Sequence, residues 1–497
     1  MRNNKFGILI LGLVLILNSS CKDDEVLDLQ NPNVVNADFD ITNTSQLLAL
    51  STAPYASLQV VGLYQRHMYY IHDGMSDEAA GAGMETDKQQ LNDYTFDPSN
   101  ICIEFYWTEC YNGIASCNTV IGREADILAI SDALIPEIEK RYAVGEAYYM
   151  RAYYFWLLAS RFGDVPLPLS LATNDEESSL PRTSRATVYQ QILSDVAKAV
   201  EFLPTKADRN NLNAGYGGRA TIGAANALAA RMLFFDGNKY AEALPFLDAV
   251  INDPSGYTLN GVNFIDNFTI AGEYNPESIW EVNFNESFAL SWDAGGFTEN
   301  TFRGQEYCWG NLNQTGVLQA AFDNDVKPDP RKDVTFLTDG RWKKYSIANI
   351  NGTQDCNDQG LSGINFRVLR FADVLLMKAE ALNELGTGST QEILDLMNAT
   401  RIRAGMDLYG SAALNAVWPV TTQDEIRQAI RHERRIELAG EQVRLNDLLR
   451  WGIAKEMIEA ARPAVNFEIG ISELLPIPTS EISSNSSISN SDQNPGY

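Results

Sequence analysis

Two glutamates that are four residues apart form the most enzyme-like feature of this sequence. Glu433 and Glu437 lie in a stretch, 426–451, whose four-and-three spacing predicts one long helix with a shared face. That face consists of Ile426, Ile430, Glu433, Glu437, Gly440, Arg444, Asp447 and Trp451. On a helix the two carboxylates would be ~6 Å apart. Such a pair can act as acid and nucleophile in glycoside hydrolysis, and a Glu433→Gln variant would then lose turnover.

An internal ion network is the alternative, and nearby arginines favour it. Arg431, Arg434, Arg435 and Arg444 occur in the same stretch, and buried charges need partners of this kind. A carboxylate surrounded by arginines has a lowered pKa, which is the wrong direction for a general acid. The sequence therefore predicts a structural role for the two glutamates and no catalytic residues.

Other catalytic and metal-binding patterns are absent from the sequence. It contains three histidines, whereas zinc and non-haem iron sites commonly need two or three that converge. We find no HExxH motif, GxSxG elbow or P-loop. Asp323-Asn324-Asp325 has oxygen ligands for calcium but lacks EF-hand spacing, so a solvated turn is favoured and calcium binding stays open. We expect no cofactor and no metal site.

Aromatic residues in loops are the better functional candidates. Sugars present flat C–H faces that stack on aromatic rings, and binding residues concentrate in loops. Trp292 and Trp309 stand among glycines and asparagine in an irregular stretch, with Arg303 and Tyr307 nearby. We expect these four residues to contact a ligand.

An earlier irregular insert, 73–98, supplies weaker candidates. Asp77, Glu85 and Tyr94 are the residues of this insert that we expect near a ligand. The remaining tryptophans that we assessed fall on helical faces or on an expected strand and are predicted to be core residues: Trp107, Trp156, Trp280 and Trp451.

The first 25 residues predict export and lipid attachment. Arg2 and Lys5 precede twelve apolar residues, 6–17, a run too short for the ~20 residues of a membrane-spanning helix but typical of a signal peptide. The segment ending at Cys21 resembles a lipobox, although Asn18 stands where leucine is usual. We interpret 1–20 as signal peptide and 21–45 as lipidated Cys21 with its tether. A leader followed by a disulfide-bonded Cys21 is the alternative.

Composition and periodicity indicate a helical globular domain over 46–497. With 38 basic and 65 acidic residues, the net charge of −27 provides no basic face for nucleic acid. Helical spacing runs over 138–159, 187–203, 219–235, 240–251, 366–385 and 391–404. Paired helices of this size joined by short turns predict tetratricopeptide (TPR)-like units. We therefore predict a mainly α fold: a scaffold of TPR-like pairs, a long irregular insert at about 255–365, and few strands, one of them around Trp280.

The cysteines give little further information. Cys110 and Cys117 lie on one face of an expected helix, ~10 Å apart and too far for a disulfide. Free buried thiols are expected at Cys102, Cys110 and Cys117, and a bridge between Cys308 and Cys356 stays open.

Seven segments resemble, in order, the SusD/RagB-like outer-membrane nutrient-binding lipoproteins of Bacteroidota. The segments are AVGEAYYMRAYYFWLLASRFGDVPLPL (143–169), RATVYQQILSDVAKAVEFLP (185–204), GRATIGAANALAARMLFFDGNKYAEAL (218–244), DPRKD (329–333), RVLRFADVLLMKAEALNELG (367–386), IRHERRIELAGEQVRLNDLLRWG (430–452) and LLPIPTSEI with the terminal QNPGY. The resemblance implies a helical scaffold with ligand-binding loops and no catalysis. It also implies a partner, a SusC-like TonB-dependent transporter, on which family members sit as a lid.

Four functions remain open at this point. The resemblance and the aromatic inserts favour a lipoprotein on the outer face of the outer membrane that captures an oligosaccharide. A peptide-binding member of the same family is the next candidate. A surface glycoside hydrolase and a structural scaffold without a small ligand are less favoured. The acidic Lys22-Asp23-Asp24-Glu25 after the lipobox resembles an export signal to the cell surface.

Overall fold

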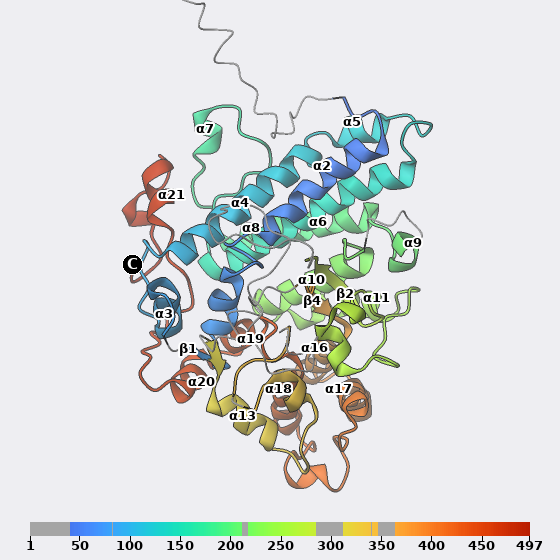
Figure 1. Ribbon diagram of the computed structural model, residues 1–497, viewed down its shortest axis with the longest axis vertical. Coiled ribbons are helices and arrows are strands. Elements are labelled where there is room, and N and C mark those ends of the chain that lie inside the picture. The colour runs from blue at the N-terminus through green and yellow to red at the C-terminus, as the bar shows by residue number, and fades with distance from the viewer. Residues whose placement is uncertain (1–39, 82, 211–216, 285–311, 339, 346–362) are drawn as a thin grey trace, which may run out of the picture. The chain divides into compact units, whose positions relative to one another are not determined.

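Helices make up most of the structure, with two small sheets of two strands each in the part described. The computed structural model describes residues 40–81, 83–210, 217–284, 312–338, 340–345 and 363–497 (Figure 1). Residues 42–497 form one compact unit. The prediction of a mainly helical fold with few short strands is confirmed.

Four long helices in the first 202 residues of the chain lie side by side. They are α2 (Thr44–Ala56), α4 (Ile101–Ile121), α6 (Glu137–Phe162) and α8 (Arg185–Phe202) (Figure 1). Helix α6 packs against the other three, so every side chain from residue 142 to its end is buried. It ends at Gly163, whose φ of 75° lies in the region that favours glycine. The predicted helices over 138–159 and 187–203 are therefore confirmed.

The next four helices continue the packing as pairs. Helix α10 (Ile222–Phe235) contacts α8 and pairs with α11 (Tyr240–Ile251), and α16 (Phe371–Leu385) contacts α11 and pairs with α17 (Thr390–Ala404). A short turn joins the two helices of each pair, and one helix of each pair packs against the preceding pair. This arrangement agrees with the predicted TPR-like scaffold.

The predicted helix over 366–385 is wrong in its first five residues. Phe366–Arg370 is strand β4, which pairs antiparallel with β2 (Ser278–Val282). All five side chains of β4 are buried on both faces of the strand, and the order of apolar residues and arginines in FRVLR has no period of two that would distinguish it from helix. The strand predicted around Trp280 is confirmed, and the Trp280 ring packs edge-on against Tyr153 at 4.8 Å between centroids.

The predicted single helix over 426–451 is two helices. Helix α18 (Gln423–Leu438) ends before Gly440, and α19 (Arg444–Arg450) begins after it. Gly440 has φ of 67°, and a Cβ atom there would lie 2.5 Å from Cζ3 of Trp342. The chain turns at the one residue type that tolerates both this conformation and this close approach. The face predicted from 426 to 451 is therefore interrupted.

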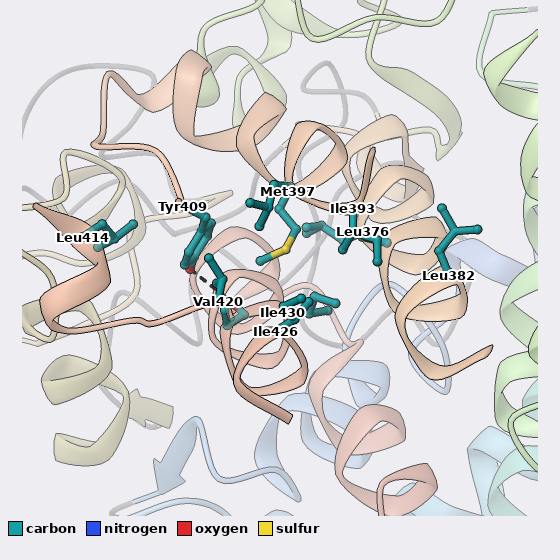
Figure 2. Packing of buried hydrophobic residues seen from close by; sticks show 12 residues of the cluster. Leu376, Leu382, Ile393, Met397, Tyr409, Leu414, Val420, Ile426 and Ile430 are labelled. Atoms are coloured by element: carbon teal, nitrogen blue, oxygen red, sulfur yellow. Dashed lines mark hydrogen bonds between the residues drawn. The ribbon is translucent and has the colours of Figure 1, made fainter. Parts of the chain in front are cut away.

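An apolar cluster holds α16, α17 and α18 together. Figure 2 shows Leu376, Met397 and Ile430, one from each helix, pointing toward one another. Tyr409, from the segment that follows α17, closes the cluster, and its hydroxyl donates to the carbonyl of Ala429 on α18 at 3.4 Å. The cluster fixes α18 on the scaffold, with one face toward the interior.

The remaining elements are short. The helices are α3 (Thr86–Asp93), α5 (Glu124–Ala129), α7 (Asp175–Ser178), α9 (Lys206–Asn210), α13 (Gly316–Asp323), α14 (Arg331–Thr335), α20 (Ala454–Ala461) and α21 (Thr479–Ser484). Strand β1 (Ala79–Gly81) pairs antiparallel with β3 (Leu312–Gln314). A π-helical turn spans Tyr69–Gly74, and 3-10 turns span Ser57–Gln59, Phe264–Phe268, Ile270–Gly272, Leu414–Ala416 and Asn490–Asp492. Across the described residues, no helix combines the length and the apolar character needed to cross a bilayer.

Three cysteines have the state that the sequence predicts. Cys102, Cys110 and Cys117 are buried free thiols on α4. Cys308 and Cys356, for which a bridge stayed open, lie outside the described residues, as does Cys21.

Close packing between α4 and α6 gives a stability prediction. A Cβ atom on Gly113 of α4 would lie 2.3 Å from the ring of Tyr154 on α6, whose hydroxyl also donates to the Pro54 carbonyl at 2.6 Å. Gly113→Ala should therefore lower the free energy of unfolding by about 1–3 kcal/mol, against the usual preference for alanine in helices. Gly316→Ala on α13 meets no atom within 4 Å and serves as the control. Urea unfolding that shows both variants equally stable would contradict this packing.

Candidate functional site

Glu433 and Glu437 lie in the interior and are saturated by arginines. Both side chains have no exposed surface. Arg331 of α14 donates Nη1 to both carboxylates, at 2.6 Å to Glu433 Oε1 and 3.1 Å to Glu437 Oε2. Arg401 of α17 lies 3.4 Å from Glu433 Oε2. Two further arginines, Arg370 of β4 and Arg403 of α17, bind Glu437 Oε1. We call these six residues the α18 ion network.

The network sets the protonation of the two glutamates. Burial alone would raise the pKa of Glu433, but Arg331 and Arg401 outweigh it and lower that pKa. The pKa of Glu437 is lowered in the same way, because Arg403, Arg370 and Arg331 together exceed the effect of burial. Neither group retains a proton to donate at neutral pH, so this pair lacks the acid that glycoside hydrolysis requires.

The predicted ion network is therefore confirmed, but its predicted partners are wrong. The sequence neighbours Arg434, Arg435 and Arg444 form other pairs, and Arg431 forms none among the described residues. The true partners are at least 30 residues away along the chain, so no local spacing reveals them. Two of these partners lie in segments that resemble the SusD/RagB-like family: Arg331 in DPRKD and Arg370 in RVLR.

A second set of ion pairs joins α16, α18 and α19. Arg434 of α18 binds Asp373 at 2.9 Å and Asp447 at 2.9 Å, and Arg231 of α10 binds the other oxygen of Asp373 at 2.7 Å. Arg450 of α19 binds both oxygens of Glu380 on α16. These pairs extend the same electrostatic scaffold across four helices.

Asp77 belongs to this scaffold and has no surface for a ligand. Its carboxylate accepts from Arg444 at 2.8 and 3.0 Å, and Arg435 lies 2.9 Å from Oδ2. Burial would raise the pKa of Asp77, but the two arginines lower it to about 2. The interpretation of Asp77 as a ligand contact does not fit this fully buried, ion-paired position.

Tyr94 is half-buried, and its hydroxyl is already engaged in a hydrogen bond within the protein. The hydroxyl donates to the Met75 carbonyl, and the ring packs edge-on against Phe467 at 5.2 Å between centroids. This environment favours a structural role. The other four predicted ligand residues, Trp292, Arg303, Tyr307 and Trp309, lie outside the described residues, so their role stays a prediction.

An open pocket of about 710 Å³ lies on the outer side of α18. Helix α18 contributes Gln428, Arg431, His432 and Arg435, and α13 contributes its face around Ala320. Helix α13 and its C-terminal end also contribute Val317, Ala321, Asp323 and Asn324. The rest of the lining is Trp418, Arg444 and Trp451 at the two ends of α19, and Ile453 and Met457 at the start of α20. We call this the Trp418 pocket. Its volume lies within the range of about 300–1,000 Å³ that is usual for small-molecule sites.

Trp418 is held in a fixed orientation at this pocket. Its Nε1 donates to the Asn324 carbonyl at 2.9 Å, and its ring stacks on His432 with 4.1 Å between centroids and 22° between planes. Burial lowers the pKa of His432 to about 3, so the imidazole is neutral at physiological pH. The sequence analysis missed Trp418. Its signal was an aromatic residue in the irregular segment between α17 and α18, the same pattern that singled out Trp292 and Trp309.

Trp451 was predicted to be a core residue and is only partly buried. Its ring lines the pocket with the Arg431 guanidinium 4.7 Å from its centroid, and its Nε1 donates to Glu380 at 2.9 Å. The break at Gly440 places this end of α19 at the surface. Trp107, Trp156 and Trp280 are core residues, as predicted.

The described residues provide no cluster for a metal ion. Among them, no three side chains of histidine, cysteine, aspartate or glutamate come together in a way that could hold one. In the Asp323-Asn324-Asp325 turn, Asp325 pairs with Arg401 at 2.9 Å and Asp323 pairs with Lys332 at 2.5 Å. These acidic groups are therefore occupied by cations of the protein itself.

Two family models match the chain in two separate parts. A model described as the SusD family matches residues 294–497, and one described as starch-binding and associating with the outer membrane matches residues 26–234. SusD-like protein P2 of Formosa agariphila is 26% identical, with 100% of both chains covered. A SusD-like protein of Bacteroides ovatus is 24% identical, with 90% of this chain and 82% of the relative covered.

Solved structures agree with these matches. A laminarin-binding SusD-like protein is 25% identical, with a TM-score of 0.73 and coverage of 92% of this chain and 100% of that one. Surface glycan-binding protein A from Bacteroides fluxus is 23% identical, with a TM-score of 0.74 and the same coverage. A SusD homologue from Bacteroides thetaiotaomicron is 20% identical, with a TM-score of 0.78 and coverage of 93% and 98%. The fold of this chain is thus the fold of these proteins.

The ion-paired carboxylates predict a loss of stability in acid. Burial would raise the pKa of Asp373, but Arg231 and Arg434 lower it to about 2, from an ordinary value of 3.8. The unfolded chain therefore binds protons first as pH falls, so this contribution is complete above about pH 4 and is lost as pH falls toward 2. Asp373→Asn should lower the free energy of unfolding at pH 7 by about 3–5 kcal/mol and flatten its decline in acid.

The control is Asp424→Asn, which removes an exposed pair with Arg427. Urea unfolding between pH 7 and pH 2 should show no measurable effect of this change. If Asp373→Asn behaved like the control, the buried pairs would not carry the stability that we assign to them.

Proposed function

Because this chain belongs to the SusD/RagB-like family, we propose that it is a cell-surface lipoprotein that captures an oligosaccharide and delivers it to a SusC-like TonB-dependent transporter. The family models and the laminarin- and glycan-binding relatives support a glycan as the ligand. The lipobox-like segment at Cys21 supports attachment to the outer membrane, facing the exterior. Lipid attachment, orientation and delivery to the transporter are parts of the proposal.

The observation that carries the proposal is the Trp418 pocket. An open hollow of about 710 Å³ admits a chain of several sugar units, and a fixed indole ring offers a flat apolar surface at its wall. Guanidinium and amide groups of Arg431, Arg435 and Gln428 are donors for sugar hydroxyls. Such a pocket combines the stacking and hydrogen-bonding groups that saccharide binding requires.

The irregular insert at about 255–365, which contains Trp292 and Trp309, is the second proposed contributor to ligand binding. Trp292 and Trp309, with Arg303 and Tyr307, have the residue types and loop context of a saccharide-binding surface. Their contribution rests on the sequence alone. The pocket and the insert can be separated by mutation, because neither set of residues overlaps with the other.

The protonation states of the described carboxylates favour binding of the ligand without cleavage. Glycoside hydrolysis needs one protonated and one ionised carboxyl group, whereas Glu433 and Glu437 are both held ionised by arginines. The transport step would then require only release of an intact ligand toward the transporter.

Replacing the aromatic rings should weaken saccharide binding. In the soluble Cys21→Ala form, we expect Trp418→Ala to raise the dissociation constant at least about tenfold, because a stacking surface is lost from the pocket. We expect the double variant Trp292→Ala, Trp309→Ala to abolish binding. Isothermal titration with a panel of neutral and acidic oligosaccharides, and with peptides in parallel, measures these changes.

Val417→Ala is the matched control for the pocket, since Val417 is exposed beside Trp418 and does not line the hollow. Its affinity should equal that of the parent protein, and thermal unfolding should show that all variants fold. Unchanged affinity in the double variant would refute the insert site. Binding of peptides with no saccharide bound would replace this proposal with peptide capture.

A further inference from the structure

The charged groups of the Trp418 pocket are unusual for so acidic a protein. The chain carries a net charge of −27, yet the charged side chains that line this pocket are three arginines and one aspartate. Asp323 is exposed and pairs with Lys332. The positive charge of Arg431, Arg435 and Arg444 therefore has to be balanced from behind the pocket wall or from a ligand.

The groups behind the wall balance only part of this charge. Arg435 and Arg444 share a single ionised carboxylate, Asp77. Glu78 lies next to it, but burial raises the pKa of Glu78 to about 8 despite the neighbouring arginines, so it is neutral at pH 7. Among the described residues its Oε1 has no hydrogen-bond partner, while Oε2 accepts from the Gly440 amide at 3.1 Å. Arg435 and Arg444 therefore share the charge of one carboxylate, Asp77, to which both bind.

Arg431 has no bound carboxylate of its own. Within the described part of the chain, its guanidinium forms no ion pair and no hydrogen bond, and the buried Nε of this half-buried side chain is unsatisfied. The guanidinium carbon lies 4.7 Å from the centroid of the Trp451 ring, a contact that holds the side chain at the pocket wall. The neighbouring scaffold arginines differ, because Arg434 and Arg450 each bind two carboxylates.

A purely structural role leaves these features unexplained. A scaffold arginine is expected to have its charge paired, since burial without a partner is costly. Stacking on Trp451 accounts for the position of Arg431 but leaves its donors free. Free guanidinium donors in a fixed fork match an oxyanion, which accepts two parallel hydrogen bonds.

From this geometry we infer that the Trp418 pocket selects an acidic saccharide, whose oxyanion group is bound by Arg431 while a sugar ring stacks on Trp418. The inference rests on the proposed function and adds the chemical class of the ligand. A uronic acid carboxylate and a sulfate ester both supply the oxyanion, and a neutral chain of the same backbone lacks it. A guanidinium that no described residue binds, beside two arginines that share one carboxylate, favours such a ligand over its neutral counterpart.

Matched ligands test the selectivity directly. The probes are an oligogalacturonate, its carboxyl-reduced form with the same backbone, and a sulfated galactan oligosaccharide, each titrated into the soluble Cys21→Ala form. We expect at least one of the acidic probes to bind at least about tenfold more tightly than the reduced form. The affinity should fall as salt is raised from 50 to 500 mM, values at which screening is weak and strong. Which acidic probe binds identifies carboxylate or sulfate.

Three variants distinguish the effect of the Arg431 guanidinium on binding from the effect of the net charge of the protein. Arg431→Gln should remove the preference for the acidic probe, and Arg431→Lys should restore part of it, because lysine keeps the charge but loses the fork. Lys198→Gln makes the same change in net charge at an exposed position of α8 and should not change the preference for the acidic probe. Thermal unfolding confirms that the variants fold.

The outcomes distinguish this inference from the proposed function. Equal affinity for the acidic and reduced probes, or an unchanged preference in Arg431→Gln, would overturn the acidic-saccharide inference while glycan capture stands. If no saccharide in the panel bound, both proposals would fall together. Binding of an acidic peptide in place of every saccharide would also overturn both.

Discussion

The cost of burying charge is the constraint on which this structure depends. Glu433 and Glu437 have no access to water, so their ionised forms are stable only with arginines at hydrogen-bonding distance. Those arginines come from α14, β4 and α17, and each must reach α18 in one register. A shift of any of these elements would leave a charge unpaired in the interior. The apolar cluster of α16, α17 and α18 supplies burial (Figure 2). The ion network specifies how the helices meet.

Helix α18 serves the scaffold and the pocket with opposite faces. Glu433 and Glu437 point inward, whereas Arg431 and Arg435, each two residues earlier, line the pocket on the other side. Two residues correspond to about 200° of rotation on a helix, so the separation follows from helical geometry. The inner face holds charges that are fully paired, and the outer face holds Arg431, whose donors are free among the described residues. The rigid inner face fixes the position of the outer donors before a ligand arrives.

Sequence periodicity predicted the elements that depend on local pattern, and it missed those that depend on distant contacts. Helix α6 and the strand at Trp280 were predictable because each has one clear period. Strand β4 was not, since it is buried on both faces and its sequence FRVLR lacks the alternation of apolar and polar residues that indicates a strand. The break at Gly440 depends on Trp342, almost 100 residues earlier. The true partners of Glu437 lie 34, 67 and 106 residues away along the chain. Asp77 looked like a loop carboxylate because its pairing with Arg444 and Arg435 is also long-range.

The central claim is that this protein binds a saccharide and does not cleave it. The most direct measurement is titration of the soluble Cys21→Ala form with oligosaccharides, followed by chromatography of the same samples after prolonged incubation. The account predicts heat of binding with at least one saccharide and recovery of that saccharide at its original length. Release of shorter products that disappears in Glu433→Gln would contradict it, because that carboxylate would then have a catalytic proton that its arginine partners are expected to exclude.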